Sequence, residues 1–243
     1  MSNKYYQPGE QRGARVGDLF DTIAQRYDLI NDLQSLWLHR RWKRLLVKMA
    51  GVRPGEKALD LCCGTGDIAF ALRAAGADVV GLDFSPAMLS VAQKRGQNEV
   101  QFIQGDAQHV PFEDAAFDIV TIGYGLRNLE SWGAGLEEMV RLARPGGRLL
   151  ALDFGKPENP VWRWVYFSWL RWVVPVFGKV FCHDSATYAY ICESLKAYPA
   201  QRGVAEKLRA LGCQDVQVRD LLGGAMCIHF ARKALNNSPA LII

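Results

Sequence analysis

The chain has 243 residues, of which 49% are hydrophobic and 22% are charged, and its formal net charge is +4. A chain of this length can bury a large core, in one α/β domain or in two smaller ones. Because Asp and Glu are spread among Lys and Arg, the charge does not indicate a nucleic-acid-binding protein, although a mildly basic face can favour anionic ligands or an anionic membrane surface.

The beginning of the chain, residues 1–15, is polar and carries no apolar signal segment. The six cysteines include no CxxC pair, so we expect reduced thiols and neither disulfides nor a metal site. These features predict a cytoplasmic protein.

Residues 16–51 are predicted to form a helical N-terminal block. Apolar residues such as Phe20, Ile23 and Tyr27 recur close to helical spacing, and a second helix with a basic side is expected over 36–50. We expect this block to act as a lid over a ligand site.

Residues 57–154 alternate short apolar strands with helices. Strands are predicted at 58–61, 78–82, 100–103, 117–122 and 148–152, and helices at 68–75, 87–94 and 132–144. Ser85 and Pro86 form a typical helix start. This alternation predicts an α/β fold of the Rossmann-like type, with a mostly parallel sheet and helices on both faces.

The last part of the chain departs from that alternation. Residues 155–203 read as an aromatic helical insertion, which we expect to form a substrate-binding cap. A helix at 204–211 and closing strands at 216–218 and 225–231 follow. We therefore expect a single domain over 1–235, with a flexible tail at 236–243. The stretch 161–181 is interrupted by charges and proline, which excludes a transmembrane helix.

The strongest chemical signal is the run Asp60-Leu-Cys-Cys-Gly64-Thr65-Gly66-Asp67 after the first strand. Glycines at a strand-to-helix turn let the backbone approach a ligand closely. Nicotinamide sites share this feature, but there a pyrophosphate lies on the helix N-terminus, where Asp67 would repel it. A carboxylate suits an ammonium group instead, which favours the methionine part of S-adenosylmethionine.

Two further carboxylates follow successive strands. Asp83 can accept hydrogen bonds from ribose hydroxyls, and Asp106 can accept from an adenine amino group, while Phe84 and Met88 can pack on the base. The residues expected to bind the cofactor are Gly64, Thr65, Gly66, Asp67, Asp83, Phe84, Met88, Asp106, Ala107 and Gly123.

From Val16 to about Lys233 the chain resembles the menaquinone and ubiquinone biosynthesis C-methyltransferases of the class I, S-adenosylmethionine-dependent type. The resemblance rests on an opening block around Phe20, Tyr27, Asn31 and His39, and on the tetrapeptide Gly125-Leu126-Arg127-Asn128. It also rests on the Arg144–Arg148 run, on Tyr188, Tyr190 and Ser194, and on His229. Cys62-Cys63 departs from the small pair that is usual before the glycine turn.

The resemblance implies methyl transfer to the ring of a reduced polyprenylated quinone precursor, most simply demethylmenaquinol. A 2-polyprenyl-6-methoxy-1,4-benzoquinol of ubiquinone biosynthesis, or another small phenol or lipid, remains the alternative acceptor. Arg127 would stabilise a phenolate and Asn128 would orient it, with His229, Asp184, Tyr188 or Tyr190 as the candidate base. The expected substrate-binding residues are Tyr27, Asn31, Arg127, Tyr188, Tyr190 and Ser194.

The chain has seven Trp, several of them in the insertion, which is more than a core ordinarily needs. We expect part of this segment to accept an isoprenoid tail, and peripheral contact with the inner face of a membrane is left open, as is a homodimer. A nicotinamide oxidoreductase and a non-catalytic adenosylmethionine-binding subunit are the rival interpretations.

Overall fold

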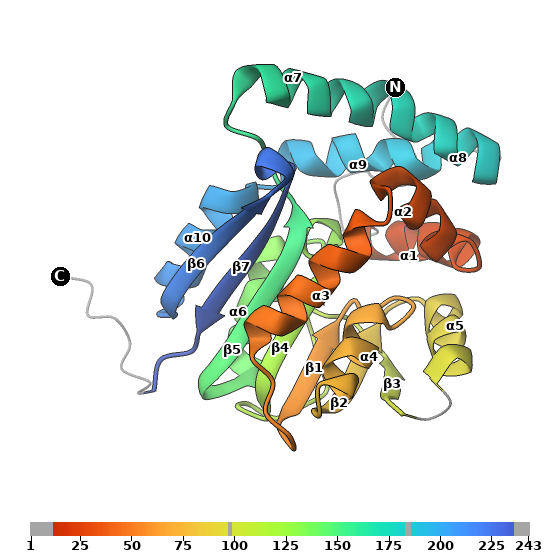
Figure 1. Cartoon of the computed structure of the whole chain (residues 1–243). Helices are drawn as coiled ribbons and strands as arrows, with labels where there is room; N and C mark the ends of the chain where they lie inside the picture. Colours follow the sequence, from red (N-terminus) through yellow and green to blue (C-terminus); the bar gives the residue numbers. More distant parts are fainter. Residues whose placement is uncertain (1–11, 97–98, 183–185, 236–243) are drawn as a thin grey trace.

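The computed structural model describes residues 12–96, 99–182 and 186–235. Within these ranges a seven-stranded sheet runs through the molecule in the order β3-β2-β1-β4-β5-β7-β6 (Figure 1). The strands are β1 (Lys57–Leu61), β2 (Asp78–Asp83), β3 (Gln101–Gln104), β4 (Phe117–Gly123), β5 (Ala143–Phe154), β6 (Gln214–Leu221) and β7 (Met226–Arg232). Strands β1 to β5 are parallel, whereas β7 pairs antiparallel with β5 and β6. The predicted Rossmann-like fold class is confirmed.

Helices cover both faces of the sheet, with α3 and α4 on one face and α6 and α10 on the other (Figure 1). The helices are α1 (Arg12–Ile23), α2 (Tyr27–Ser35), α3 (Leu38–Ala50), α4 (Asp67–Ala74), α5 (Pro86–Gly96), α6 (Trp132–Leu142), α7 (Pro160–Ser168), α8 (Val174–Cys182), α9 (Ala186–Ala197) and α10 (Ala200–Ala210). A π-helical turn, η2 (Trp169–Val173), joins α7 to α8, and a short 3-10 turn, η1 (Leu126–Asn128), follows β4. Covered on both faces, the central strand β4 is mostly apolar, and it is buried along nearly its whole length.

Most predicted elements are confirmed, and the differences lie at their ends. Pro86 is the first residue of α5, and the Ser85 hydroxyl accepts the Met88 N–H at 3.0 Å, as a helix cap should. Helix α6 ends at Leu142, two residues before the predicted end, because Ala143 already pairs with β4. Helix α10 begins four residues before the predicted start.

Helices α1 and α2 and helices α7–α9 lie across the edge of the sheet where the parallel strands end, and α3 runs over one face of the sheet toward that edge (Figure 1). Polar contacts fasten α2 and α3 to that edge. Asp28 of α2 accepts the Thr65 hydroxyl at 2.8 Å and pairs with Arg95 at 3.0 Å, and Lys43 of α3 pairs with Asp67 at 2.8 Å. The helical block is therefore held directly over the glycine turn.

Candidate functional site

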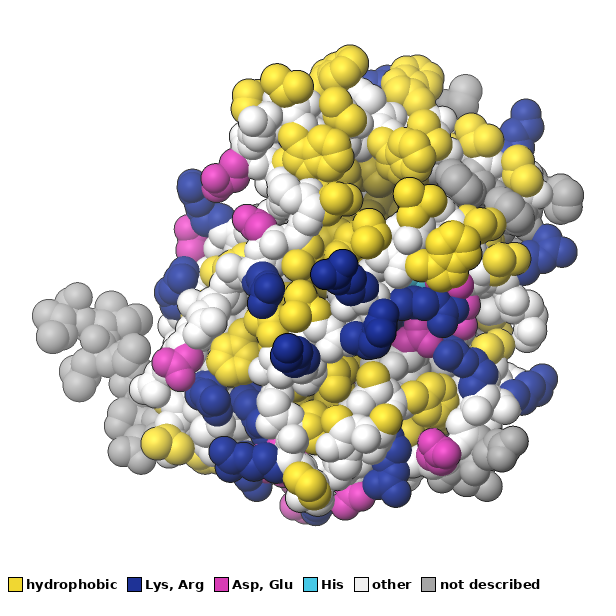
Figure 2. Space-filling model, in the orientation of Figure 1, with side chains coloured by type: hydrophobic (Ala, Val, Ile, Leu, Met, Phe, Trp, Pro, Cys, Tyr) yellow, Lys and Arg dark blue, Asp and Glu magenta, His cyan; other side chains and the backbone are white. Residues whose placement is uncertain are grey.

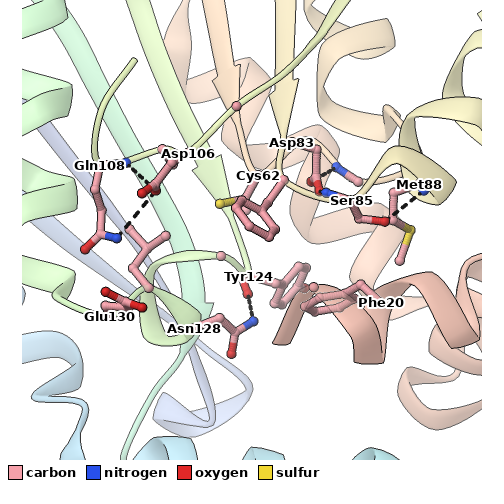
Figure 3. A pocket seen from close by; sticks show the side chains of 18 of the residues that line it. Phe20, Cys62, Asp83, Ser85, Met88, Asp106, Gln108, Tyr124, Asn128 and Glu130 are labelled. Atoms are coloured by element: carbon pink, nitrogen blue, oxygen red, sulfur yellow. Dashed lines mark hydrogen bonds between the residues drawn. The ribbon is translucent and has the colours of Figure 1, made fainter. Parts of the chain in front are cut away.

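A cavity of about 320 Å³ opens at the carboxyl ends of β1, β2 and β4 (Figure 3). We call it the first cavity. Its walls combine the turns after the strands with three residues of the N-terminal helices, namely Gly17, Phe20 and Tyr27. The residues from the turns are Cys62, Gly64, Asp83, Phe84, Ser85, Met88, Gly105, Asp106, Ala107, Gln108, Gly123, Tyr124, Gly125, Asn128, Leu129 and Glu130. The position agrees with the rule that open α/β sheets bind ligands at this edge.

The glycine turn leaves room on the cavity side. Gly64 has φ +56° and Gly66 has φ +89°, which side chains rarely adopt. A Cβ at Gly64 would meet no atom within 4 Å, so open space lies in front of that backbone. At Gly66, in contrast, a Cβ would come within 2.7 Å of the Phe70 ring. Gly64 therefore borders the ligand space, while Gly66 allows α4 to pack.

Asp83 is held by backbone donors at the end of β2. One carboxylate oxygen accepts the Gly64 N–H at 2.7 Å and the other accepts the Ser85 N–H at 2.9 Å. Burial raises the pKa of Asp83 above its ordinary value. Because each oxygen retains further lone pairs, the carboxylate can still accept from a bound diol. Phe84, which packs on Gly17 of α1, and the buried Met88 supply apolar surface beside it.

Asp106, predicted to meet an adenine amino group, also lines the first cavity (Figure 3). Its Oδ1 accepts the Gln108 N–H at 2.9 Å, which orients the carboxylate. Ala107 and Gly123 line the same cavity. Seven of the ten predicted cofactor-binding residues thus line this cavity, although they come from four separate turns; they are Gly64, Asp83, Phe84, Met88, Asp106, Ala107 and Gly123.

Asp67, which was expected to bind the cofactor, does not line the first cavity, but it lines a small hollow beside the glycine turn together with Asp60 and Lys43. Its carboxylate accepts from Lys43 at 2.8 Å and from Arg95 at 2.7 Å. Burial would raise the pKa of Asp67, but these two cations hold it well below its usual range. Thr65 and Gly66 lie outside the first cavity as well, since the Thr65 hydroxyl is directed at Asp28.

A second carboxylate, Asp60, lies beside the glycine turn. Its Oδ1 accepts the Thr121 hydroxyl at 2.7 Å, while its Oδ2 is buried with no hydrogen-bond partner among the described residues. Burial raises the pKa of Asp60 to about 7. Asp60 borders a small hollow together with Gly64, Gly123 and Tyr124, all three of which also line the first cavity. An ammonium group there would satisfy the unpaired oxygen.

A second cavity, of about 480 Å³, lies between the N-terminal helices and α7–α9. Its lining is predominantly apolar and includes Ile23, Leu33, Leu36, Leu38, Trp42, Phe154, Trp162, Val165, Tyr166, Trp169, Leu170, Val174, Ile191, Leu222, Ala225 and Met226. Tyr27 and Tyr124 line both cavities. The two spaces therefore adjoin each other across these tyrosines.

Tyr124 has an unusual conformation at this junction. Its φ is +61°, which is rare for an aromatic residue, and its hydroxyl is buried without a hydrogen-bond partner in the described part of the chain. The next residue, Gly125, has to be small, because a Cβ there would come within 2.5 Å of the Cβ of Cys62. A strained backbone conformation such as that of Tyr124 tends to occur at functional sites.

Arg127 enters the second cavity as a buried cation. Its Nη1 donates to the Tyr124 carbonyl at 2.6 Å and lies 3.5 Å from Asp153, and its Nη2 donates to the Tyr190 hydroxyl at 3.2 Å. The guanidinium also stacks 4.6 Å from the centre of the Phe154 ring. Burial acts against the charged form, but Tyr190 and Asp153 raise the pKa of Arg127, so the group stays protonated.

Tyr27, Asn31 and Tyr190 line the second cavity near Arg127, as expected of substrate-binding residues. Burial and the neighbouring Tyr190 raise the pKa of Tyr27, so this phenol stays neutral. Asn128 belongs to the first cavity instead. Its amide donates to the Tyr124 carbonyl at 3.2 Å (Figure 3), and its Oδ1 is buried without a partner among the described residues.

His39 is a polar group of the second cavity that sequence reasoning did not select as a base. It is 4% exposed, its Nε2 lies 2.9 Å from Oδ1 of Asp32, and its Nδ1 has no partner in the described part of the chain. Burial lowers the pKa of His39 and Lys43 lowers it further, although Asp32 acts in the opposite direction. A neutral, oriented imidazole can therefore accept a proton near pH 7.

Several expected site residues are not brought to either cavity. His229 of β7 is buried, and its Nε2 contacts the Gln201 carbonyl at 3.0 Å; Ser194 is buried and donates to the Ile191 carbonyl at 2.9 Å. Both side chains contact backbone carbonyl groups inside the fold. Asp184 lies outside the described residues, and so does the side chain of Tyr188 in α9.

Comparison with known proteins agrees with this arrangement. A family model described as the ubiE/COQ5 methyltransferase family matches residues 8–233. A demethylmenaquinone methyltransferase of Paenarthrobacter aurescens is 40% identical over 224 residues, covering 92% of this chain and 88% of the relative. One of Halalkalibacterium halodurans is 38% identical, covering 92% and 94%. An S-adenosylmethionine-dependent methyltransferase structure from Aquifex aeolicus superposes with a TM-score of 0.57 at 18% identity, covering 79% of this chain and 89% of that one, a likeness of fold alone.

Proposed function

Since the chain belongs to the ubiE/COQ5 methyltransferase family and is an S-adenosylmethionine-dependent methyltransferase, we propose that it methylates a ring carbon of demethylmenaquinol. The observation that carries this proposal is the pair of adjoining cavities, one polar at the strand ends and one apolar and larger, which meet at Tyr27 and Tyr124. A polar cofactor and an apolar acceptor would meet at those tyrosines.

The first cavity fits the cofactor. Open space in front of Gly64 and the unpaired oxygen of Asp60 suit the methionine part with its ammonium group. Asp83 would hold the ribose hydroxyls, and Asp106 would hold the adenine amino group beside Phe84 and Met88. S-adenosylmethionine supplies an electrophilic methyl group on a sulfonium centre. The chain's contribution is to hold the acceptor carbon within about 3–3.5 Å of it.

The second cavity suits a prenylated aromatic acceptor. Tyr27, Asn31, Arg127 and Tyr190 gather polar atoms at one part of a wall that is otherwise apolar, so the hydroxylated ring is placed there. Trp162, Val165 and Trp169 of the insertion line the same space and would surround the tail. In this proposal the segment 155–203 forms a cap over the second cavity.

An ordinary phenol has a pKa of about 10, so it is neutral near pH 7 and its ring carbons are weak nucleophiles. Removal of the hydroxyl proton makes the ring carbon nucleophilic. We assign the base role to His39 Nδ1, which would take the proton of a quinol hydroxyl while Asp32 holds Nε2. The buried positive charge of Arg127 would stabilise the phenolate that remains. After methyl transfer the ring carbon would lose its own proton while the oxygen regains one, so that one proton is released for each methyl group transferred. Asn128 would orient the ring edge at the junction.

The apolar acceptor also implies contact with a membrane. No helix within the described ranges is long and apolar enough to span one. Five side chains along α7, η2 and α8 are more than half exposed and form an apolar face, namely Val161, Trp164, Trp172, Val176 and Val180. We assign this apolar face to peripheral contact with the bilayer in which prenylated quinols dissolve.

The test is transfer of label from S-adenosylmethionine to reduced demethylmenaquinone and, in parallel, to a reduced 2-polyprenyl-6-methoxy-1,4-benzoquinone. Preferential labelling of the first acceptor, abolished in Asp83→Ala and Arg127→Ala, is expected. Preference for the second acceptor would move the protein to ubiquinone biosynthesis. Labelling of neither would overturn the acceptor assignment while leaving the family intact.

A further inference from the structure

A third hollow, of about 580 Å³, lies beside the second cavity on the outer side of α3. Four cations line it, Arg41, Arg44 and Lys48 from α3 and Arg219 from β6. The rest of its lining is apolar, and Leu38, Trp42 and Leu222 belong to both this hollow and the second cavity. We call it the basic groove.

The cations of the basic groove are available to a ligand. All four are exposed, and among the described residues none of them forms an ion pair with a carboxylate. The groove lining contains no acidic residue. Four like charges held within one hollow repel each other, so binding an anion there is favourable.

The basic groove borders the apolar face. Figure 2 shows Lys and Arg side chains gathered over α3, directly below a broad band of hydrophobic side chains over α7 and α8. Arg171 adds a cation inside that band, 5.2 Å from the Trp172 ring. Exposed Trp and Val next to a basic collar is the composition of a surface that lies in the headgroup region of a bilayer.

We propose that the basic groove binds the phosphate of an anionic phospholipid headgroup while the apolar face enters the acyl layer. Guanidinium groups match phosphate oxygens in paired hydrogen bonds, and the apolar floor made by Leu38, Trp42 and Leu222 suits the beginning of an acyl chain. In this orientation the second cavity faces the bilayer, so the prenyl tail enters without crossing water. The inference deepens the proposed membrane contact and rests on it.

The experiment measures partition of the full chain into sonicated vesicles of phosphatidylcholine alone and of phosphatidylcholine with phosphatidylglycerol. The groove variant is Arg44→Gln/Arg219→Gln, whose side chains line neither of the other two cavities. The matched control is Arg202→Gln/Arg209→Gln, which removes the same charge from exposed positions on α10. Trp164→Ala/Trp172→Ala tests the apolar face.

We expect wild type to prefer the anionic vesicles, and each charge removed from the groove to weaken that partition roughly fivefold. The control pair should bind as wild type does, and the Trp pair should weaken partition into both vesicle types. Free inorganic phosphate at millimolar concentration should not displace the protein. Displacement by free phosphate would instead identify a soluble phosphate site.

Equal partition of the groove variant and its control would overturn the proposal. A second outcome would also overturn it. If sedimentation shows that the wild-type chain is a dimer and that the groove variant is a monomer, the basic groove is an interface between two copies of the chain. Methylation of a short-chain, water-soluble quinol without vesicles separates the two proposals. If that reaction fails while groove-dependent binding persists, the acceptor assignment is wrong and the lipid site stands.

Discussion

The two cavities are built in opposite ways. The first consists mainly of short turns that directly follow β1, β2, β3 and β4, and its polar groups are held by backbone N–H donors, as at Asp83. The second draws its lining from Ile23 to Met226, and its lining is predominantly apolar apart from polar residues such as His39 and the group around Arg127. Cofactor recognition therefore depends on local chain geometry, whereas acceptor recognition depends on how distant helices pack.

This difference predicts that the first cavity tolerates few substitutions and that the second tolerates more. A turn that must present two backbone donors to one carboxylate allows few residues. An apolar wall needs only the right volume and hydrophobicity, so several side chains can replace one another. The polar groups of the second cavity should not be replaceable in this way. Substitutions at these groups therefore test the comparison of the two cavities most directly.

The largest effect is expected for Arg127→Ala. Removing the buried cation leaves a phenolate without its stabilising charge, so methyl transfer should fall about 1,000-fold. The dissociation constant for S-adenosylmethionine, measured by calorimetry, should change little because Arg127 does not line the first cavity. A variant that loses cofactor binding as well would show that the two cavities are not independent. Thermal unfolding, with Arg127→Lys as the control, separates catalysis from the loss of the Asp153 and Tyr190 contacts.

His39→Gln should reduce methyl transfer about 100-fold, since a positioned base contributes on that order. The pH profile is the more specific readout. Burial and Lys43 lower the pKa of His39, and Asp32 and Asp67 partly oppose them, so the neutral base is lost only as the pH falls below the ordinary histidine value. Wild-type kcat should therefore decline on the acid side at a pH below about 6.5, and the variant should lack that decline. An unchanged acid limb in the variant would remove His39 from the mechanism.

Asp60 and Asp67 offer a matched pair of carboxylates in the small hollow beside the first cavity. Asp60→Asn should weaken S-adenosylmethionine binding about 30-fold, because a hydrogen bond to a charged group is lost. Asp67→Asn should alter affinity far less but lower the melting temperature, since its carboxylate pairs with Lys43 and Arg95. The opposite ranking of the two dissociation constants would restore Asp67 as the ammonium partner.

The fold could be predicted almost entirely from the sequence because its signals are local. Apolar runs identified all seven strands, and Ser85-Pro86 marked the start of α5. Asp83 and Gly64 were found for the same reason, since a polar residue at a strand end and a glycine turn are visible within a few positions. Errors of a few residues at α6 and α10 reflect strand pairing and packing that no local pattern records.

The acceptor site was harder to predict because its partners lie far apart. Asp67 was assigned to the cofactor, and no local pattern shows that Lys43, 24 residues away, pairs with it. His229 was named as a candidate base, and His39 was not, because nothing in the sequence shows that β7 turns its histidine to the Gln201 carbonyl. One signal was available for His39, namely Asp32 seven residues earlier, across a predicted break between two helices. Asp60 was hidden inside a strand that reads as apolar.

The smallest effect is expected at Asp28, whose contacts join helix α2 to the glycine turn and to Arg95. Asp28→Asn keeps an acceptor for the Thr65 hydroxyl but removes the charge that pairs with Arg95, a partly exposed ion pair. Such pairs contribute up to about 1 kcal/mol, so the KM for S-adenosylmethionine should rise about threefold with kcat nearly unchanged. Asp78→Asn, which breaks the exposed pair with Arg73, is the control.

If the N-terminal helices act as a lid, Asp28→Asn should also speed limited proteolysis within residues 12–50, and added cofactor should slow it again. Identical KM values and cleavage rates in the two variants would mean that these helices form a fixed wall, and that the first cavity depends on the strand turns alone.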